Sequence, residues 1–490
     1  MKLFQLVLAG LLIGFFGCQH STNEIIIVGK ITGKFPEKVE YTSPINGICN
    51  WGFTESVRPD SIGNFKIKIE SDKTIFIKLR TAYPEQGTLI VEPGKTYNVA
   101  FDLFKKDTVF SVTDKSSIIQ NAYNRFPNPP HIQMGITEFQ RDSVVSRIKG
   151  TVEQRRSSEI AVFEKFLSDK VISQNVFDLV KTDRNCYYDA VLATTAWVKD
   201  YMFILRGLKV FTPEVEHLWR ETFKNPLFSN PNIVNSQWFN FYAESYIYFK
   251  EYTNGNFTKE KLEEITKSNQ PKSYRVKKAK EYLPKELCEN YLAYYLNDES
   301  SQKKYEKELI TLFDDFKSQY PNSKYNSFIS PLIDEVIKFQ KIAESKFGDK
   351  MKFVKNYQNL NSMADLTNAM DKGRIFVDVW ATWCGPCKAE FDYKEALQKL
   401  LTKNNIRTLF ISIDRDQDST QWKNMIKFYK LEGYHVRANA QLITELRKLF
   451  DNNGSIYIPW YILIDENGKI VKKHASPPSQ INNLEKEIAE

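Results

Sequence analysis

Residues 376–388 read Phe-Val-Asp-Val-Trp-Ala-Thr-Trp-Cys-Gly-Pro-Cys-Lys. The first part of this stretch is apolar apart from one aspartate, which is typical of a buried strand. Two cysteines separated by two residues follow, and apolar residues then recur at Ala396, Leu397, Leu400 and Leu401. That spacing predicts an amphipathic helix. A strand, a turn with two cysteines and a helix therefore decide the fold of this part of the chain.

The spacing of Cys384 and Cys387 suits a reversible disulfide. If Cys387 lies in the first helical turn, Cys384 lies at the helix N-terminus, where unpaired N–H groups favour its thiolate and lower its pKa. Cys387 is then shielded, as a resolving thiol should be. Two alternatives stay open: half of a zinc site, although no second C-x-x-C or C-x-x-H supplies the other ligands, and a permanent structural disulfide. We favour a redox-active disulfide, and we expect no metal and no cofactor.

The rest of the C-terminal segment, residues 351–490, alternates predicted strands and helices. This order is typical of an α/β layer structure. We expect strands over residues 374–380, 407–413, 461–464 and 470–471, with Asn467-Gly468 as a hairpin turn. Ser479 is a candidate N-cap for the last helix.

The C-terminal segment resembles the thioredoxin superfamily, most closely the TlpA- and ResA-like thiol–disulfide oxidoreductases found outside the cytoplasm. The likeness rests on residues 376–388, on Ile458-Pro459 followed by a strand, and on residues 464–470, which read Ile-Asp-Glu-Asn-Gly-Lys-Ile. It covers roughly the last quarter of the chain. Members of the Bacteroidetes type are envelope lipoproteins with an N-terminal β domain and a helical middle domain, and the resemblance implies that organisation here.

The resemblance implies a substrate-binding surface beside the disulfide. Pro459 matches a cis-proline that faces the two cysteines, and X–Pro is the bond for which the cis form is accessible. A proline at this point leaves the backbone of Ile458 free to pair with a bound peptide. Trp383, directly before Cys384, belongs to the same surface. An ordinary trans turn proline is the alternative.

The resemblance also implies two acids that move protons. Asp378 matches the buried acid beneath the disulfide, and burial in an apolar strand should raise its pKa. It could then accept the proton of Cys387. Glu390 follows Cys387 by three residues, on the same helix face, and matches a glutamate that ResA-like proteins place near their cysteines. A structural role for Asp378 and a solvated surface position for Glu390 are the alternatives.

Some positions depart from the family pattern. The motif helix lacks the usual proline and has Phe391-Asp392-Tyr393 instead, so we expect a straighter helix. Trp460 follows the proline where threonine is common, which predicts a bulkier substrate surface. Phe410 replaces a lysine near the buried acid. We expect residues 414–458 to be a helical continuation, and His435 and His474 to be structural or surface residues.

The N-terminus has the pattern of an export signal. A short positive start precedes the apolar stretch from Leu3 to Phe16, which is shorter than the roughly 18 to 20 apolar residues that a membrane-spanning helix needs. Cys18 follows a glycine, as in bacterial lipoprotein signals, where that cysteine is lipidated. We therefore expect a lipid-anchored protein on the periplasmic side of the cell envelope. A plain secreted protein and an uncleaved anchor are the alternatives.

The segments between the signal and residue 351 predict two further domains. Residues 24–113 contain β-rich stretches at 25–28, 65–69, 74–79 and 97–101 and predict a β-sandwich-like domain. Residues 116–350 predict a helical domain, in which the aromatic run 238–249 is a helix interface or, alternatively, a peptide-binding groove. Cys49, Cys186 and Cys288 are expected to be buried thiols, although a Cys186–Cys288 bridge stays open.

These features favour a protein that acts on protein disulfides. The net charge of +8 is spread over 490 residues without a basic block, so we expect no nucleic-acid partner. The main hypothesis is a reductase of protein disulfides, whose own active-site disulfide is reduced again by a membrane thiol donor. The alternatives are a disulfide oxidase or isomerase, and a binding protein whose N-terminal domains carry the main function.

Overall fold

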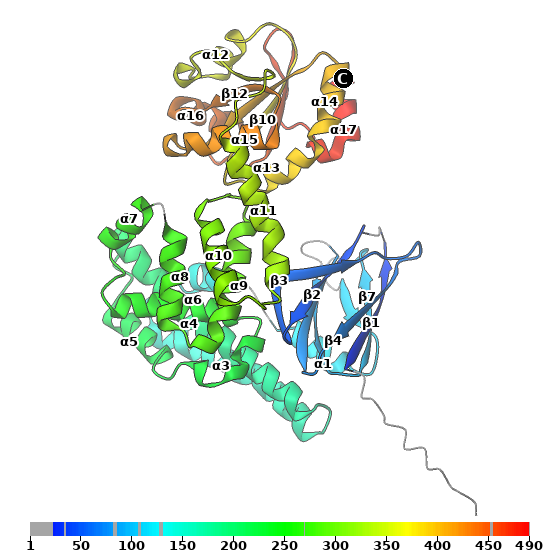
Figure 1. The fold of residues 1–490 in the computed structure, drawn as a ribbon, viewed down its shortest axis with the longest axis vertical. Coiled ribbons are helices and arrows are strands. Elements are labelled where there is room, and N and C mark those ends of the chain that lie inside the picture. The colour runs from blue at the N-terminus through cyan, green and yellow to red at the C-terminus, as the bar shows by residue number, and fades with distance from the viewer. Residues whose placement is uncertain are drawn as a thin grey trace, which may run out of the picture. The chain divides into compact units, whose positions relative to one another are not determined.

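The computed structural model describes residues 23–33, 36–81, 86–105, 109–126, 131–268, 270–450 and 454–489. The expected signal and Cys18 lie outside these ranges. The chain divides into two compact units, Met1–Asn269 with Lys277–Tyr291, and Gln270–Val276 with Leu292–Glu490. Figure 1 shows the strands and helices of both units. The three domain ranges expected from the sequence stay a prediction.

The first unit begins with two four-stranded sheets. One has the order β4-β1-β7-β8 and the other the order β3-β2-β5-β6. A single hydrophobic core takes residues from both sheets, so the two pack as a sandwich. The four predicted β stretches correspond to β1, β4, β5 and β7. The strands are β1 Glu24–Thr32, β2 Val39–Ile45, β3 Ile48–Val57, β4 Asn64–Glu70, β5 Ile75–Arg80, β6 Gln86–Val91, β7 Thr96–Asp102 and β8 Phe110–Val112.

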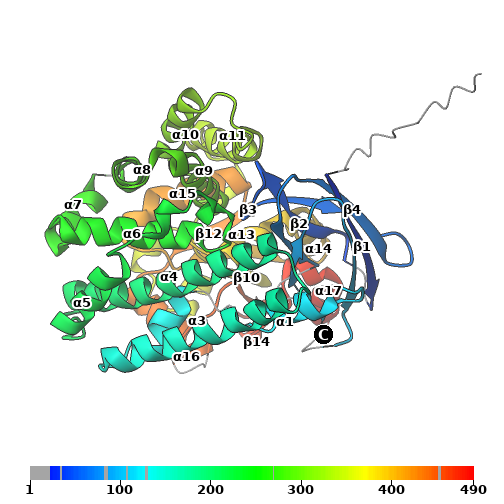
Figure 2. The same cartoon turned by 90° about the horizontal axis from the view of Figure 1, so that it is seen from below.

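Helices make up the rest of the first unit. The longest, α4 (Gln174–Arg206), begins at the N-cap Ser173, whose hydroxyl accepts a hydrogen bond from Val176 N, and ends at Gly207, where φ is 63°. Helices α3, α4 and α6 lie side by side (Figure 2). The helical elements are α1 Ser117–Asn124, α2 His131–Gln133, a π-helical turn Met134–Glu138, α3 Val145–Ser168, α5 Pro213–Thr222, α6 Phe239–Thr253 and α7 Lys259–Lys267.

The aromatic run in this unit is a helix interface, as the main interpretation predicted. Phe239, Tyr242 and Ile247 of α6 are fully buried. The lone cysteines are buried free thiols, so the Cys186–Cys288 bridge that the sequence left open does not form. Burial raises the pKa of all three thiols, which makes them poor nucleophiles.

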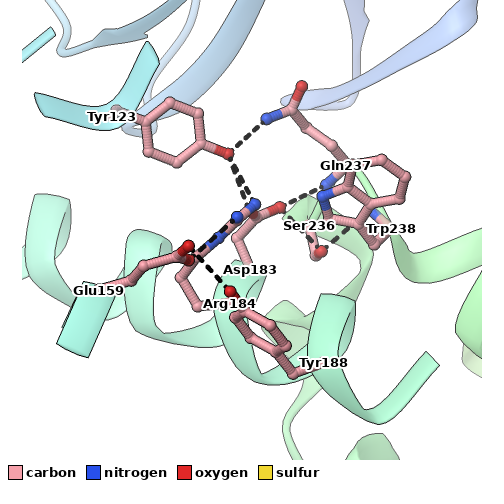
Figure 3. Close-up of polar contacts among 8 residues, drawn as sticks. All are labelled: Tyr123, Glu159, Asp183, Arg184, Tyr188, Ser236, Gln237 and Trp238. Atoms are coloured by element: carbon pink, nitrogen blue, oxygen red, sulfur yellow. Dashed lines mark hydrogen bonds and ion pairs between the residues drawn. The ribbon is translucent and has the colours of Figure 1, made fainter. Parts of the chain in front are cut away.

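A charged cluster lies in the interior of the first unit (Figure 3). Arg184 is fully buried and forms ion pairs with Asp183 and Glu159. Asp183 also accepts hydrogen bonds from Tyr123 Oη, at 2.8 Å, and from Ser236 Oγ, at 3.0 Å. The cluster joins α1, α3, α4 and the segment before α6. Its polar groups are largely occupied by one another, which is the pattern of a structural element.

The second unit contains a six-stranded sheet of order β14-β13-β10-β11-β12-β9. The central strand β10 pairs in parallel with β11 and antiparallel with β13. Helices α14 and α17 cover one face through a shared apolar cluster. The strands are β9 Met351–Phe353, β10 Ile375–Trp380, β11 Arg407–Ser412, β12 Gly433–Arg437, β13 Trp460–Ile464 and β14 Ile470–Lys472.

The helices of this unit include two that precede the sheet. In chain order the helices are α10 Glu308–Gln319, α11 Asn326–Ala343, α12 Met363–Asn368, α13 Gly385–Glu390, α14 Lys394–Lys403, α15 Ser419–Tyr429, α16 Ala440–Phe450 and α17 Ile481–Ala489. Helices α8 Pro271–Tyr282 and α9 Lys285–Ser301 have residues in both units. Within the stretches that the structure covers, no helix is both long and apolar enough to cross a bilayer.

Three local expectations about the second unit were wrong. Residues 414–458 are not purely helical, because β12 pairs with both β11 and β9 there. The motif helix is not straighter without its proline: α13 ends at Glu390, and a 3₁₀ turn over Phe391–Tyr393 follows. Phe391 is buried there against Trp380, with ring centroids 5.3 Å apart, so packing sets the break. Ser479 lies in a 3₁₀ turn before α17 and is not its N-cap.

The predicted hairpin turn is confirmed. Strands β13 and β14 pair antiparallel. Gly468 has a φ of 83°, which favours glycine. Asp465 Oδ1 accepts hydrogen bonds from the backbone N–H groups of Asn467 and Lys469, both at 2.9 Å.

Candidate active site

The disulfide lies where the central strand passes into a helix. All six residues of β10 are buried, and the chain then turns through Ala381–Trp383 into α13. Cys384 and Cys387 form a disulfide with a Cα–Cα distance of 5.3 Å. Trp383 is 58% exposed, whereas both cysteines are buried. An exposed indole thus lies directly before the reactive pair.

Cys384 occupies the N-cap position of α13. Its backbone is extended, and its sulfur accepts a hydrogen bond from Cys387 N at 3.1 Å. The free N–H groups of a first helical turn favour negative charge, so reduction of the disulfide would leave a stabilised thiolate on Cys384. This geometry is suited to nucleophilic attack on a second disulfide.

The Ile458–Pro459 peptide bond is cis, as the resemblance implied, and not an ordinary trans turn bond. Val379 pairs with Trp460 across β10 and β13, and the same register places Pro459 beside Trp380. The proline therefore lies at the end of β10 from which the disulfide turn leaves. Within the described chain, neither backbone group of Ile458 has a hydrogen-bond partner. Both groups are available to an extended peptide.

Asp378 lies in the interior of the domain. It is 2% exposed, and within the described chain its Oδ1 has no hydrogen-bond partner. Burial, together with the charge of Glu390, raises the pKa of Asp378 to about 8. Phe410, which pairs with Asp378 in the sheet, brings no cation that would lower this pKa. A carboxyl with this pKa can exchange a proton with a thiol near neutral pH.

Glu390 affects the titration of Asp378, and its own carboxylate is held by hydrogen bonds and is not a solvated surface group. It is half-buried, and its two carboxylate oxygens accept hydrogen bonds from Ser479 N at 2.9 Å and Ser479 Oγ at 2.8 Å. These bonds attach the end of α13 to the 3₁₀ turn before α17. The charge of Glu390 thus acts on Asp378, while Glu390 itself lies nearer the surface.

The turn before Cys384 is held by a clamp of Thr382, Asp414 and Lys388, which no local sequence pattern indicates. Thr382 donates hydrogen bonds from its N and Oγ1 to Asp414, at 3.0 and 2.8 Å. The carbonyl of Thr382 accepts from Lys388 Nζ at 3.2 Å. Lys388 directly follows Cys387, so its side chain connects the two ends of the disulfide turn. All three polar groups of Thr382 are therefore bound.

Lys388 also ties this turn to a distant loop of the same unit. Its Nζ donates to the carbonyls of Gln302 and Lys303, at 2.9 and 3.2 Å. The side chain is 2% exposed, and burial with the nearby charges of Lys304 and Lys303 lowers its pKa to about 8. The loop, residues 302–305, has two non-glycine residues in the left-handed region, Lys303 at φ 53° and Tyr305 at φ 60°.

The expectation for Trp460 was wrong. This residue is buried, its indole N–H donates to the carbonyl of Lys473 at 2.6 Å, and its ring packs on Phe450. It therefore adds nothing to a substrate surface. Near the proline, the exposed aromatic residue is Tyr457. His435 is a buried structural residue, as predicted, and burial lowers its pKa to about 4.

A buried central strand, a disulfide that opens the next helix and a cis-proline before the antiparallel strand define a thioredoxin-like domain. Residues 346–488 match the Redoxin family. Across the described side chains, no group of three or more His, Cys, Asp or Glu is arranged to hold a metal ion.

Comparisons with known proteins agree with this class. The chain is 28% identical over 109 residues to the thiol-disulfide oxidoreductase ResA of Bacillus thuringiensis subsp. konkukian, which is 22% of this chain and 58% of that protein. It is 29% identical over 116 residues to the thiol:disulfide interchange protein DsbE of Vibrio cholerae, or 22% of this chain and 53% of that one. The chain thus spans little more than half the length of these curated relatives.

A solved structure shows a similar partial match. The thioredoxin domain of a thiol-disulfide oxidoreductase from Bacteroides vulgatus is 23% identical and has a TM-score of 0.21, with 25% of this chain and 83% of that chain covered. The C-terminal domain of the present chain is thus a thioredoxin-like domain that matches the Redoxin family and is similar to the ResA-like thiol–disulfide oxidoreductases.

Proposed function

We propose that this protein is an extracytoplasmic thiol–disulfide oxidoreductase that reduces disulfides in other proteins. One observation carries the proposal: Cys384 and Cys387 form a disulfide at the first turn of α13, with the exposed Trp383 directly before it. The family of the C-terminal domain and the names of its relatives support the same reaction class.

The proposed reaction transfers two electrons from the reduced protein to the substrate. The Cys384 thiolate attacks one sulfur of a substrate disulfide, the substrate S–S bond breaks, and the other substrate sulfur leaves as a thiolate. Cys387 then loses its proton to the carboxylate of Asp378 and attacks Cys384 Sγ. The mixed disulfide breaks, the second substrate thiolate leaves, and the Cys384–Cys387 bond forms. A donor dithiol, which we expect at the membrane, must reduce this bond before the next cycle.

We assign substrate contact to Trp383, Ile458 and Pro459. The exposed indole offers apolar area, and the backbone groups of Ile458, which have no partner in the described chain, offer strand-like hydrogen bonds. Both features recognise extended polypeptide and require no particular side chain. This supports a protein disulfide as the substrate.

Trapping with matched cysteine variants tests the reaction. Cys387→Ser should accumulate mixed disulfides through Cys384, because the resolving thiol is missing, and the wild type should reduce insulin. Cys288→Ser is the control, since Cys288 is a buried free thiol outside the site. The proposal fails if the wild type leaves insulin oxidised and Cys387→Ser traps nothing beyond the level of Cys288→Ser.

The direction of electron flow is set by the reduction potential. The Gly-Pro pair between the cysteines and the resemblance to ResA favour a reducing protein. Equilibration with glutathione buffers should therefore give a potential near those of reducing thioredoxins, about −270 mV. A value near −120 mV would instead assign the protein to the disulfide oxidases.

The proposed location rests on the N-terminal sequence. An apolar stretch that ends before Cys18 supports export and lipidation of that cysteine. We expect labelled palmitate on the wild type and a membrane-bound protein. Cys18→Ser should carry no label and should leave the membrane fraction, and retention of both properties would disprove the anchor.

A further inference from the structure

Two buried oxygen atoms without a hydrogen-bond partner in the described chain lie on one face of the central sheet. They are Oδ1 of Asp378 and Oη of Tyr461. The two residues are directly opposite each other in the antiparallel pairing of β10 and β13. Opposed residues in such a pair have Cβ atoms about 4.5–5.5 Å apart and side chains on the same face. A buried hydroxyl without a hydrogen-bond partner lowers the stability of the fold, which suggests that the hydroxyl of Tyr461 has a role in another state of the site.

The surroundings of this pair are apolar apart from one acid. The Tyr461 ring stacks on Phe376, with centroids 5.5 Å apart, and leucine and isoleucine side chains of α14 and α17 cover the face. The charged group that acts on both Asp378 and Tyr461 is Glu390, from the end of α13. Neither group has a nearby cation among its electrostatic partners. Tyr461 is therefore the neutral hydrogen-bond donor directly across the strand pair from the acid, and Trp380 Nε1, two residues beyond Asp378 on β10, is a second buried donor without a partner in the described chain.

We propose that Tyr461 is a positioning residue for the buried acid: its phenolic O–H donates a hydrogen bond to Asp378 whenever the carboxylate is ionised. The role rests on the proposed function of Asp378 as acceptor of the Cys387 proton. Tyr461 touches no reacting sulfur and acts only through Asp378. In the described chain, with the disulfide formed, the two residues are opposite each other without this bond, and we expect the bond to form when Asp378 loses its proton.

One proton changes its position in the resolving step. The proton leaves Cys387 Sγ and forms an O–H bond on Asp378, while the phenolic proton stays on Tyr461. Burial and the charges of Asp378 and Glu390 raise the pKa of Tyr461, so the phenol is a donor of hydrogen bonds and not an acid. A donor that stabilises the carboxylate keeps a larger fraction of Asp378 ionised at neutral pH.

The substitution Tyr461→Phe removes only the hydroxyl. Hydrogen bonds to charged groups contribute about 1.5–3 kcal/mol. At pH values below the pKa of Asp378, the ionised fraction of this residue should therefore be roughly 10-fold or more lower in the variant than in the wild type. In full-length oxidised protein, the carboxyl carbon of Asp378 followed by NMR should then titrate at least one pH unit higher than in the wild type. Tyr357→Phe, a buried tyrosine of the same domain away from the acid, should leave this titration unchanged.

A second measurement separates positioning from a structural role. The attack of Cys387 on a preformed mixed disulfide should slow about 10-fold at pH 7 in Tyr461→Phe, with resistance to urea equal to or above that of the wild type. In an Asp378→Asn background the same change should have no kinetic effect. An unshifted Asp378 titration, or an equal loss of rate in the Asn background, would overturn the inference. A wild type that does not reduce insulin would disprove the proposed function instead, and the titration would still test the coupling.

Discussion

The substitution Asp378→Asn should make the C-terminal sheet more stable at neutral pH while it slows the reaction. Asp378 is almost completely buried, and its carboxyl group has no hydrogen-bond partner in the described chain. Burial and Glu390 raise its pKa to about 8. The folded protein therefore holds a proton at this site at a pH at which the unfolded chain has already lost it.

The size of the effect follows from proton linkage. An unfolded aspartate has a pKa of about 3.9, so between about pH 4 and pH 8 the folded state binds one proton more than the unfolded state. The contribution of Asp378 to the free energy of unfolding is therefore fully present below about pH 4. Above that pH it decreases by about 1.4 kcal/mol for each pH unit, up to about pH 8. Integrated to pH 7 this amounts to a cost of about 4 kcal/mol, and to pH 5 of about 1.5 kcal/mol. Asparagine has the same shape and does not titrate.

Hydrogen exchange of the β10 amides measures the opening free energy of this sheet. The stability difference between Asp378→Asn and the wild type should grow by about 2–3 kcal/mol from pH 5 to pH 7. Asp371→Asn, which changes an exposed acid of the same domain, should show no such growth. If the difference between Asp378→Asn and the wild type is constant across this range, the acid is ionised in the folded protein and the reasoning is refuted.

Three further results are expected. Lys388→Met should lower the free energy of unfolding by about 1–3 kcal/mol and speed hydrogen exchange in residues 302–305, because three carbonyls lose their donor. The surface substitution Lys403→Met should do neither. Unchanged hydrogen exchange in Lys388→Met would exclude the clamp. Arg184→Met should destabilise the first unit by about 3–5 kcal/mol in urea unfolding, since it leaves two carboxylates buried, without changing the rate at which dithiothreitol reduces the disulfide. Trp383→Ala should raise KM for insulin at least several-fold but not for a small aromatic disulfide, and equal effects on both would remove Trp383 from the substrate surface.

Elements with a uniform burial pattern could be predicted from the sequence. The run of apolar residues in β10 and the Asn-Gly turn before β14 have local signals that tertiary structure does not alter. Strand β12, Gly433–Arg437, has no such signal, since its mixed residues become a strand only because β11 and β9 lie on either side of it. The break after Glu390 was missed for a similar reason: packing of Phe391 sets it, and no proline or glycine marks it.

The candidate site divides in the same way. Cys384, Cys387 and the cis-proline belong to short motifs in which spacing alone carries the chemistry. Lys388 could not be recognised, because two of its three acceptors lie about 85 residues earlier in the chain. Tyr461 was visible only as one apolar position of a strand, and its relation to Asp378 depends on the register of β10 and β13.

The hydrogen bonds from Lys388 to Gln302 and Lys303 affect where the boundary of an isolated C-terminal domain, or of a chimera that contains it, should be placed. Residues 346–488 match the family, yet a fragment that begins at 346 lacks two of the three carbonyls that solvate a buried ammonium under the disulfide turn. Such a fragment must either hydrate that ammonium by opening its structure or release its proton. The portable unit of this chemistry therefore begins upstream of the point at which its fold begins, and a chimera that keeps loop 302–305 should behave as the parent does.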